Sequence, residues 1–350
     1  MKKYFTVFIL LMITAGGCKK HNQEDNAPLP KEKKWVVTTV AGNGTAGFGN
    51  GAALSAKFDF PVDVAVDKDG DIYVTDADNH RIRKISGGQV STFAGNDNSG
   101  YINGNGTTAQ FVSPWAIASD ANGNFYTSDI DGDHIRKISP TADVTTYTYT
   151  LAPNTPLWFN LGPEGGIVTD VTGNIYISDT YNQHIRKINK SGQATVIAGS
   201  ERGGFQDGNG AAAKFYLPGG IAIDRQGNLY VADSYNFRIR KITPAGDVST
   251  FAGNGAFGHA DGDPGIAQFM FPVDIVTDRD DDLYVADNNR IRKITPSGIV
   301  STIAGSTAGY KDGDGADAKF WGPYGIGIDA QGNIYVADTF NERIRKISFE

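Results

Sequence analysis

The sequence has a single cysteine in 350 residues, Cys18. One cysteine leaves no pair for an internal disulfide or a redox couple. There is no Gly-x-Ser-x-Gly elbow, and the many glycine-rich runs lie between short β-type segments, not between a strand and a helix. The common signatures of serine hydrolases, thiol oxidoreductases and phosphate-binding loops are therefore missing.

Positive charge is also in deficit. The chain carries 32 basic against 39 acidic residues, a formal net charge of −7. Nucleic-acid binding needs a basic face to neutralise phosphates. We therefore expect no nucleic-acid partner.

The one long apolar run lies at the N-terminus. Residues 1–18 begin with Lys2 and Lys3, continue through an apolar stretch to about Ile13, and end in small residues before Cys18. Such a segment is typical of a secretory signal and is short for a membrane span. Its end, Ala15-Gly16-Gly17-Cys18, resembles the bacterial lipobox, which implies lipidation of Cys18, although leucine is usual where Ala15 stands. A plain secreted protein with a stray cysteine is the alternative.

The next segment, residues 19–34, is polar, contains proline and shows no periodicity. This composition predicts a flexible tether between a lipid anchor and a folded domain. Lys19 differs from the aspartate that retains lipoproteins in the inner membrane of enterobacteria. We therefore expect an exported lipoprotein at the outer membrane or cell surface, attached to the membrane through its lipid alone.

The rest of the chain is built from repeats. A tyrosine followed three residues later by aspartate recurs six times, and each copy runs on into Ile-Arg-Lys-Ile; the tyrosines are Tyr73, Tyr126, Tyr176, Tyr230, Tyr284 and Tyr335. The spacing of about 50 residues is typical of propellers and other repeat arrays. Each copy reads as four short strands separated by turns of the Asp-x-x-Gly kind. In the fifth copy Asp281 stands where glycine is expected, which predicts an altered hairpin.

These features predict an all-β protein, a six-bladed β-propeller of four-stranded antiparallel blades. The last copy lacks its fourth strand, while an unmatched "WVVTTVAG" begins at Trp35, so we expect the N-terminal strand to complete the last blade. The segment "PGGIAIDRQGNLYVADSYNFRIRKI" resembles an NHL repeat, and similar units fill residues 35–350. The resemblance implies one NHL-repeat propeller domain, expected to be monomeric, and it says little about function.

Residues repeated in every blade are interpreted as structural. We expect Asp233 to accept hydrogen bonds from loop amides and to pair with Arg238. The Ile-Arg-Lys-Ile side chains are expected around the rim, with their stems over apolar surface. Recurrent phenylalanines are predicted to fill the space between blades: Phe58, Phe111, Phe159, Phe215, Phe269 and Phe320.

Function is sought where the repeat is broken. The first strand of each blade lines the channel of a propeller, so residues just after its leading proline face the channel mouth. Here the copies differ, and the candidate ligand-binding residues are Asp63, Trp115, Glu164, Asp274 and Tyr324. Carboxylates beside an aromatic wall predict a divalent cation site, Ca²⁺ or Mg²⁺ with Asp63 and Asp274 as ligands, or a sugar site. Solvated carboxylates at an open mouth are the alternative.

Five copies share a glycine-rich insert between strands, such as "GGFQDGNGAAAKF". The third copy is a second break, because this insert is replaced by a stretch containing Trp158. If exposed, Trp158 is a candidate contact for a partner.

Two classes of function remain from the sequence. The first is a non-enzymatic binding or assembly scaffold on the cell envelope, whose insert-bearing face contacts a protein, peptide or glycan, with no catalytic residue assigned. The second is a metal-dependent hydrolase or lactonase, similar to the gluconolactonase and regucalcin propellers, in which a central cation activates water. No convincing general base accompanies Asp63 and Asp274, so binding is favoured.

Overall fold

The computed structural model describes residues 32–129, 134–153, 155, 159–163 and 165–350. Residues Lys34–Glu350 form one compact unit. The predictions for the signal segment, Cys18 and most of the tether fall on residues 1–31 and so lie outside the described residues. In the part of the chain that is described, no helix has the length and apolar character needed to cross a membrane.

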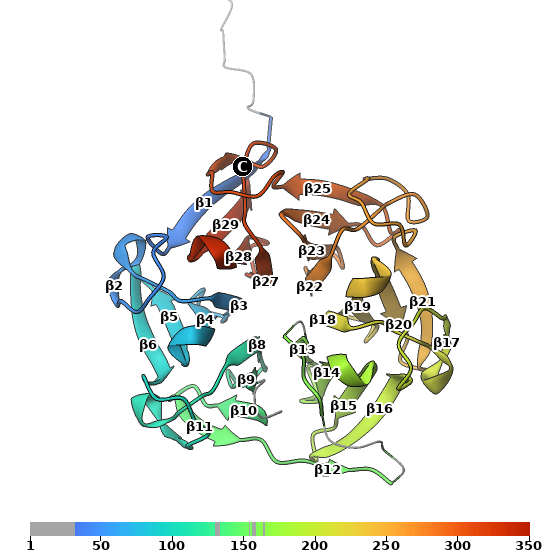
Figure 1. Ribbon diagram of the computed structural model, residues 1–350, viewed down its shortest axis with the longest axis horizontal. Helices are drawn as coiled ribbons and strands as arrows, with labels where there is room; N and C mark the ends of the chain where they lie inside the picture. The colour runs from blue at the N-terminus through green and yellow to red at the C-terminus, as the bar shows by residue number, and fades with distance from the viewer. Residues whose placement is uncertain (1–31, 130–133, 154, 156–158, 164) are drawn as a thin grey trace, which may run out of the picture. The chain divides into compact units, whose positions relative to one another are not determined.

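The unit from Lys34 is a ring of six antiparallel sheets, which confirms the six-bladed propeller (Figure 1). From the channel outward, the blades are as follows: β3(Pro61–Val66), β4(Ile72–Asp76), β5(Arg81–Ser86) and β6(Gln89–Gly95); β8(Pro114–Ser119), β9(Phe125–Asp129), β10(His134–Ile138) and β11(Asp143–Thr146); β13(Ile167–Thr169), β14(Ile175–Asp179), β15(His184–Ile188) and β16(Gln193–Gly199); β18(Pro218–Ile223), β19(Leu229–Asp233), β20(Arg238–Ile242) and β21(Asp247–Ala252); β22(Pro272–Thr277), β23(Leu283–Asp287), β24(Arg290–Ile294) and β25(Val300–Ala304); β27(Pro323–Ile328), β28(Ile334–Asp338), β29(Arg343–Phe349) and β1(Trp35–Ala41).

Five blades carry a short fifth strand on their outer edge. These strands are β2(Gly51–Ala52), β7(Gly104–Asn105), β12(Thr150–Leu151), β17(Gly208–Asn209) and β26(Gly313–Asp314). Four come from the glycine-rich inserts and pair antiparallel, whereas β12 of the third blade pairs parallel with β16. The inserts thus cover outer strand edges that would otherwise be free to pair with another chain.

The first and last strands of the propeller lie in the same sheet. β1 pairs antiparallel with β29, in a register that runs from Trp35 opposite Phe349 to Ala41 opposite Ile344. β1 is therefore the fourth strand of the sixth blade, and the two ends of the described domain are hydrogen-bonded to each other.

The hydrophobic core lies between the blades. It forms six clusters, each built from residues of neighbouring sheets. The six recurrent phenylalanines are each at most 2% exposed, as predicted for side chains that fill the space between blades.

The repeated aspartate and arginine form a buried pair in every blade, and two predictions about these residues were wrong. Asp233 accepts hydrogen bonds from the amide of Tyr216 and from Arg240 Nη1 at 2.8 Å, so its partner is Arg240 and not Arg238. Arg238 donates instead to the carbonyls of Asn236 and Asn254. Arg240 points inward and is fully buried, where its charge needs a counter-ion.

The equivalent arginines of the other blades are buried in the same way and do not lie around the rim: Arg83, Arg136, Arg186, Arg292 and Arg345. Aromatic rings enclose them. Arg240 Cζ lies 4.9 Å from the ring centre of Phe205, which belongs to the insert, and 5.2 Å from that of Phe215. The inserts therefore cover the buried ion pairs as well as the outer strand edges.

The altered turn at Asp281 keeps the hairpin of the other blades. Asp281 has a φ of 61°, a left-handed conformation that aspartate tolerates better than most residues. Its amide donates to Asp278 O as the glycines do elsewhere. Its carboxylate also accepts hydrogen bonds from Arg225 and Gln226 of the fourth blade, so the substitution adds a link between two blades.

Candidate ligand-binding face

The strand directions define two faces of the ring. The inner strand of each blade begins, and the second strand ends, on one face, which we call the mouth face. It carries the segments before Pro61 and its equivalents and the short 3-10 turns such as η2(Ala77–Asn79). The Asp-x-x-Gly hairpins lie on the opposite face, which we call the turn face.

Four of the predicted site residues meet at the centre of the mouth face. Asp63, Trp115, Asp274 and Tyr324 line one cavity of about 20 Å³, which holds roughly one water molecule. Two other predicted residues, Glu164 and Trp158, lie outside the described residues. The structure therefore brings together the residues from blades 1, 2, 5 and 6.

The two channel acids, Asp63 and Asp274, bind the main chain of the next blade. Asp63 Oδ2 accepts from the amide of Ile117 at 2.8 Å, and Asp274 Oδ2 accepts from the amide of Ile326 at 2.8 Å. The other Asp63 oxygen accepts from the amide of Val64 at 2.7 Å. Each acid thus links the inner strands of two blades, a role that sequence reasoning missed.

The glycines opposite these acids make room for them. A Cβ at Gly325 would lie 2.3 Å from Asp63 Oδ1, and a Cβ at Gly220 would lie 2.2 Å from Asp274 Oδ1. Both distances are far shorter than van der Waals contact. A Cβ would also lie 2.4 Å from Asp63 Cα at Gly325 and 2.5 Å from Asp274 Cα at Gly220. The glycine that faces each acid from the preceding blade is therefore a requirement of packing.

Burial disfavours the charged form of both channel acids. Burial raises the pKa of Asp274 to about 7, and burial together with repulsion from Asp274 holds the pKa of Asp63 well above its usual range. Calcium takes six to eight oxygen ligands. Among the described residues no group of three or more His, Cys, Asp or Glu is placed to hold a metal ion, so the predicted pair offers few ligands for one.

Aromatic rings close the mouth above the acids. Phe60 lies 5.8 Å from Trp115 and 6.1 Å from Tyr324, between ring centres, and Trp115 and Tyr324 are 6.1 Å apart at 85°. Phe340 joins the cluster 5.8 Å from Phe60. Offset and edge-to-face contacts of this kind add about 1 kcal/mol each beyond burial. The sequence pattern after the leading proline does not reveal Phe60 or Phe340. Phe60 precedes that proline, and Phe340 lies in the 3-10 turn after the second strand.

More aromatic side chains are exposed on the same face. They occupy the 3-10 turns and the segments before the inner strands, and are Tyr181, Tyr216, Tyr235, Trp321 and Phe340. Trp321 and Phe340 are 52% and 43% exposed, with ring centres 5.8 Å apart. Beside them Phe271, Asn288, Tyr324 and Phe340 line a cavity of about 260 Å³. The mouth face therefore presents an apolar surface next to a pocket.

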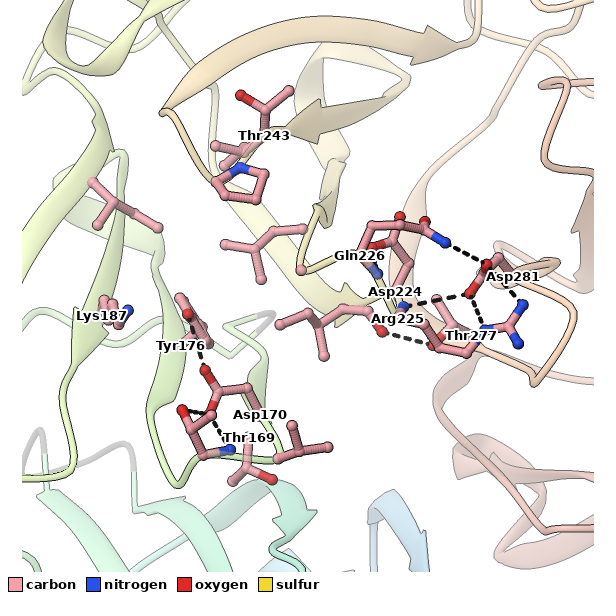
Figure 2. Close-up of a pocket in the computed structure, with 18 of the residues that line it drawn as sticks. Thr169, Asp170, Tyr176, Lys187, Asp224, Arg225, Gln226, Thr243, Thr277 and Asp281 are labelled. Carbon is pink, nitrogen blue, oxygen red and sulfur yellow. Dashed lines mark hydrogen bonds and ion pairs between the residues drawn. The ribbon is translucent and has the colours of Figure 1, made fainter.

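The turn face has a larger groove, shown in Figure 2. Its volume is about 590 Å³, and its walls come from the hairpins and outer strands of blades 3, 4 and 5. Some of the labelled polar groups are hydrogen-bonded to one another: Tyr176 donates to Asp170, and Arg225 and Gln226 donate to Asp281. Thr169, Ile223 and Thr277 line both this groove and the central channel of about 220 Å³, so the two cavities adjoin.

Comparison with known proteins agrees with the repeat pattern. Residues 58–85 match the NHL repeat family, and residues 94–266 match the teneurin NHL domain family. The chain is an NHL-repeat β-propeller.

Among its relatives are Protein SUPPRESSOR OF QUENCHING 1, chloroplastic, of Arabidopsis thaliana and NHL repeat-containing protein 2 of Homo sapiens. The first is 29% identical over 72% of this chain and 26% of its own length. The second is 26% identical over 91% of this chain and 43% of its own length. The chain thus spans less than half of either relative.

Solved structures share the fold. An auxiliary nutrient binding protein from Bacteroides thetaiotaomicron has a TM-score of 0.68 at 21% identity, covering 91% of this chain and 77% of that one. A gluconolactonase from Xanthomonas campestris has a TM-score of 0.59 at 12% identity, covering 90% and 89%. Similarity at this level concerns the fold alone.

Proposed function

We propose that the protein is a non-enzymatic binding module of the bacterial cell envelope, which presents its mouth face to a protein, peptide or glycan. The observation that carries this proposal is the set of exposed aromatic side chains gathered on that face. Contiguous exposed apolar surface is uncommon on soluble domains and marks interaction sites. Tyrosine and tryptophan are also enriched at such sites, because they offer a large contact area at low entropic cost.

The nutrient-binding propeller from Bacteroides thetaiotaomicron supports a binding role for this fold. Lactonase activity is the alternative, because the gluconolactonase fold is also similar. The main-chain hydrogen bonds of Asp63 and Asp274 favour binding over catalysis, since they occupy the carboxylate oxygens that would otherwise hold a cation.

The test is a binding screen of peptides and oligosaccharides against the protein and a Trp321→Ala/Phe340→Ala variant. We expect any ligand to bind the variant at least tenfold more weakly, a loss of about 1.4 kcal/mol. Val171→Ala is the control, because Val171 is 93% exposed on the turn face. Equal binding by both variants would contradict the proposal. Hydrolysis of gluconolactone with added Ca²⁺ or Mg²⁺, lost in Asp63→Ala/Asp274→Ala, would establish the alternative.

Anchoring through Cys18, at the outer membrane or cell surface, is part of the same proposal. A lipid at this residue places the chain in the membrane fraction, and removing the thiol removes the site of attachment. We expect labelled palmitate to enter the protein during growth and Cys18→Ser to abolish labelling and to release the chain in soluble form. A labelled Cys18→Ser chain would contradict this assignment.

A further inference from the structure

The exposed aromatic patch at Trp321 and Phe340 lies beside a group of acidic side chains. The negative charge of these acids indicates which kind of partner covers the patch. Phe340 packs against Phe60, whose amide donates to Glu342 Oε2 at 2.9 Å. Glu342 follows the 3-10 turn of the sixth blade, whereas Phe60 leads into the inner strand of the first. The patch therefore reaches the seam between these two blades.

Two further acids lie at this seam. The amide of Asp78 donates to the carbonyl of Asp59, and the charges of Asp59, Asp76 and Asp78 all act on Glu342. Burial and these charges raise the pKa of Glu342 to about 7. Asp76 forms a buried ion pair with Arg83. We call the other three, Asp59, Asp78 and Glu342, the acidic seam.

No ion pair with lysine or arginine is found for the acidic seam within the described residues. The neighbouring Arg343 donates to the carbonyls of Asn341 and Asn43 and stacks on Tyr310. Burial and repulsion from Asp59 raise the pKa of Asp78, and His80 acts in the opposite direction. Three acids and two exposed aromatic rings thus share one surface with little positive charge to balance them.

The equivalent seam between blades 3 and 4 shows that the fold does not require these acids. There the same three positions hold Gln183, Tyr216 and Tyr235. Gln183 Oε1 accepts from the amide of Leu217 at 2.6 Å, the same bond that Glu342 makes to Phe60. A neutral side chain therefore makes the same hydrogen bond, so this contact does not require the negative charge of the acidic seam.

We propose that the acidic seam and the patch of Trp321 and Phe340 bind a lysine or arginine side chain of an extended peptide from a partner protein. The cation lies against the aromatic faces, whose quadrupole attracts positive charge, and pairs with Glu342 and Asp78. The adjoining cavity of about 260 Å³ receives apolar atoms of the peptide. This inference rests on the proposed function and narrows its ligand to a cationic peptide.

The experiment measures binding of a fluorescent octapeptide of alternating lysine and glycine to the purified protein at low salt. The same peptide with acetylated lysines keeps the length and loses the charge. The test variant is Asp78→Asn/Glu342→Gln, in which glutamine reproduces the hydrogen bond seen at Gln183. The matched control is Asp69→Asn/Asp280→Asn, which removes two exposed acids from the turn-face hairpins.

We expect the lysine peptide to bind, the acetylated peptide to bind poorly, and the test variant to lose about fivefold or more in affinity, as two exposed charge pairs would give. Phe340→Ala should weaken binding as well, while the control should not. No binding of the lysine peptide, equal binding of the acetylated one, or an equal loss in the control would overturn the inference. If a neutral peptide or an oligosaccharide still binds in a way that requires Trp321 and Phe340, the proposed function stands and only the cationic ligand is ruled out.

Discussion

Two sets of enclosed carboxylates in this ring are neutralised in different ways. In the six blade pairs, an aspartate such as Asp233 faces a buried arginine. In the channel, Asp63 and Asp274 face main-chain amides and each other. The repeated acids hold their own blade together. The channel acids connect neighbouring blades, since Asp63 binds the second blade and Asp274 binds the sixth. An acid that recurs in every blade is therefore part of the scaffold. An acid found in one or two blades marks a place where the ring departs from the repeat.

The largest expected effect comes from breaking a repeated pair. Asp233→Ala leaves the fully buried Arg240 with only the half-exposed Asp207 as its counter-ion, which costs about 3 kcal/mol of unfolding free energy. Urea denaturation measures the loss. Lys68→Ala, which breaks an exposed pair with Asp69, is the control and should change stability by less than about 0.5 kcal/mol. A similar small change in both variants would show that the arginine finds another partner.

The second prediction concerns the fit between acid and glycine in the channel. Gly220→Ala places a Cβ 2.2 Å from Asp274 Oδ1, so we expect a loss of about 1–3 kcal/mol from overpacking. In an Asp274→Gly background the same substitution should cost less, because the carboxylate is gone. A large part of the cost should remain, because the Cβ would also lie 2.5 Å from the Cα of residue 274 and 2.9 Å from Ile275 N. A double-mutant cycle by urea denaturation measures this coupling. Equal costs in both backgrounds would mean that the clash with the main chain of residues 274 and 275 sets the whole cost.

The smallest expected effect concerns Glu342, whose carboxylate accepts a hydrogen bond from a main-chain amide, as the carboxylates of the channel acids do. Its pKa is raised to about 7 in the folded protein, against about 4.3 in an unfolded chain. The folded state therefore binds the proton more tightly, and stability is lost as pH rises through about 7. At about pH 4.5, Glu342→Gln and the parent protein should have the same unfolding free energy. At pH 8 the variant should be more stable by about 1 kcal/mol, a value discounted for the partial exposure of Glu342. Urea denaturation at both pH values provides the measurement, and a pH-independent difference would assign the effect to packing.

The sequence predicted the ring, its strand order within each blade and the buried phenylalanines, because these follow from a periodic pattern that repeats six times. It predicted that Asp63, Trp115, Asp274 and Tyr324 meet at the mouth, because equivalent positions of every blade face the same axis. It could not predict the partner of Asp233, since Arg238 and Arg240 lie on the same side of one strand and only packing decides between them.

The sequence also missed the hydrogen bonds of the channel acids and the acidic seam. Glu342, Asp59 and Asp78 belong to opposite ends of the repeat region and come together only because the ring closes. No local pattern shows such a group. Comparing each column across the blades, with the sixth placed next to the first, would have shown that three acids replace Gln183, Tyr216 and Tyr235.

The pairing of β1 with β29 makes folding of this domain depend on its last residues. Trp35 lies opposite Phe349, so the contact that completes the sixth blade spans almost the whole domain and carries the largest loop-closure entropy. During synthesis β1 has no partner until β29 has emerged. The earlier blades form an open arc until then, and loss of either strand, Trp35–Ala41 or Arg343–Phe349, would leave the same sheet incomplete.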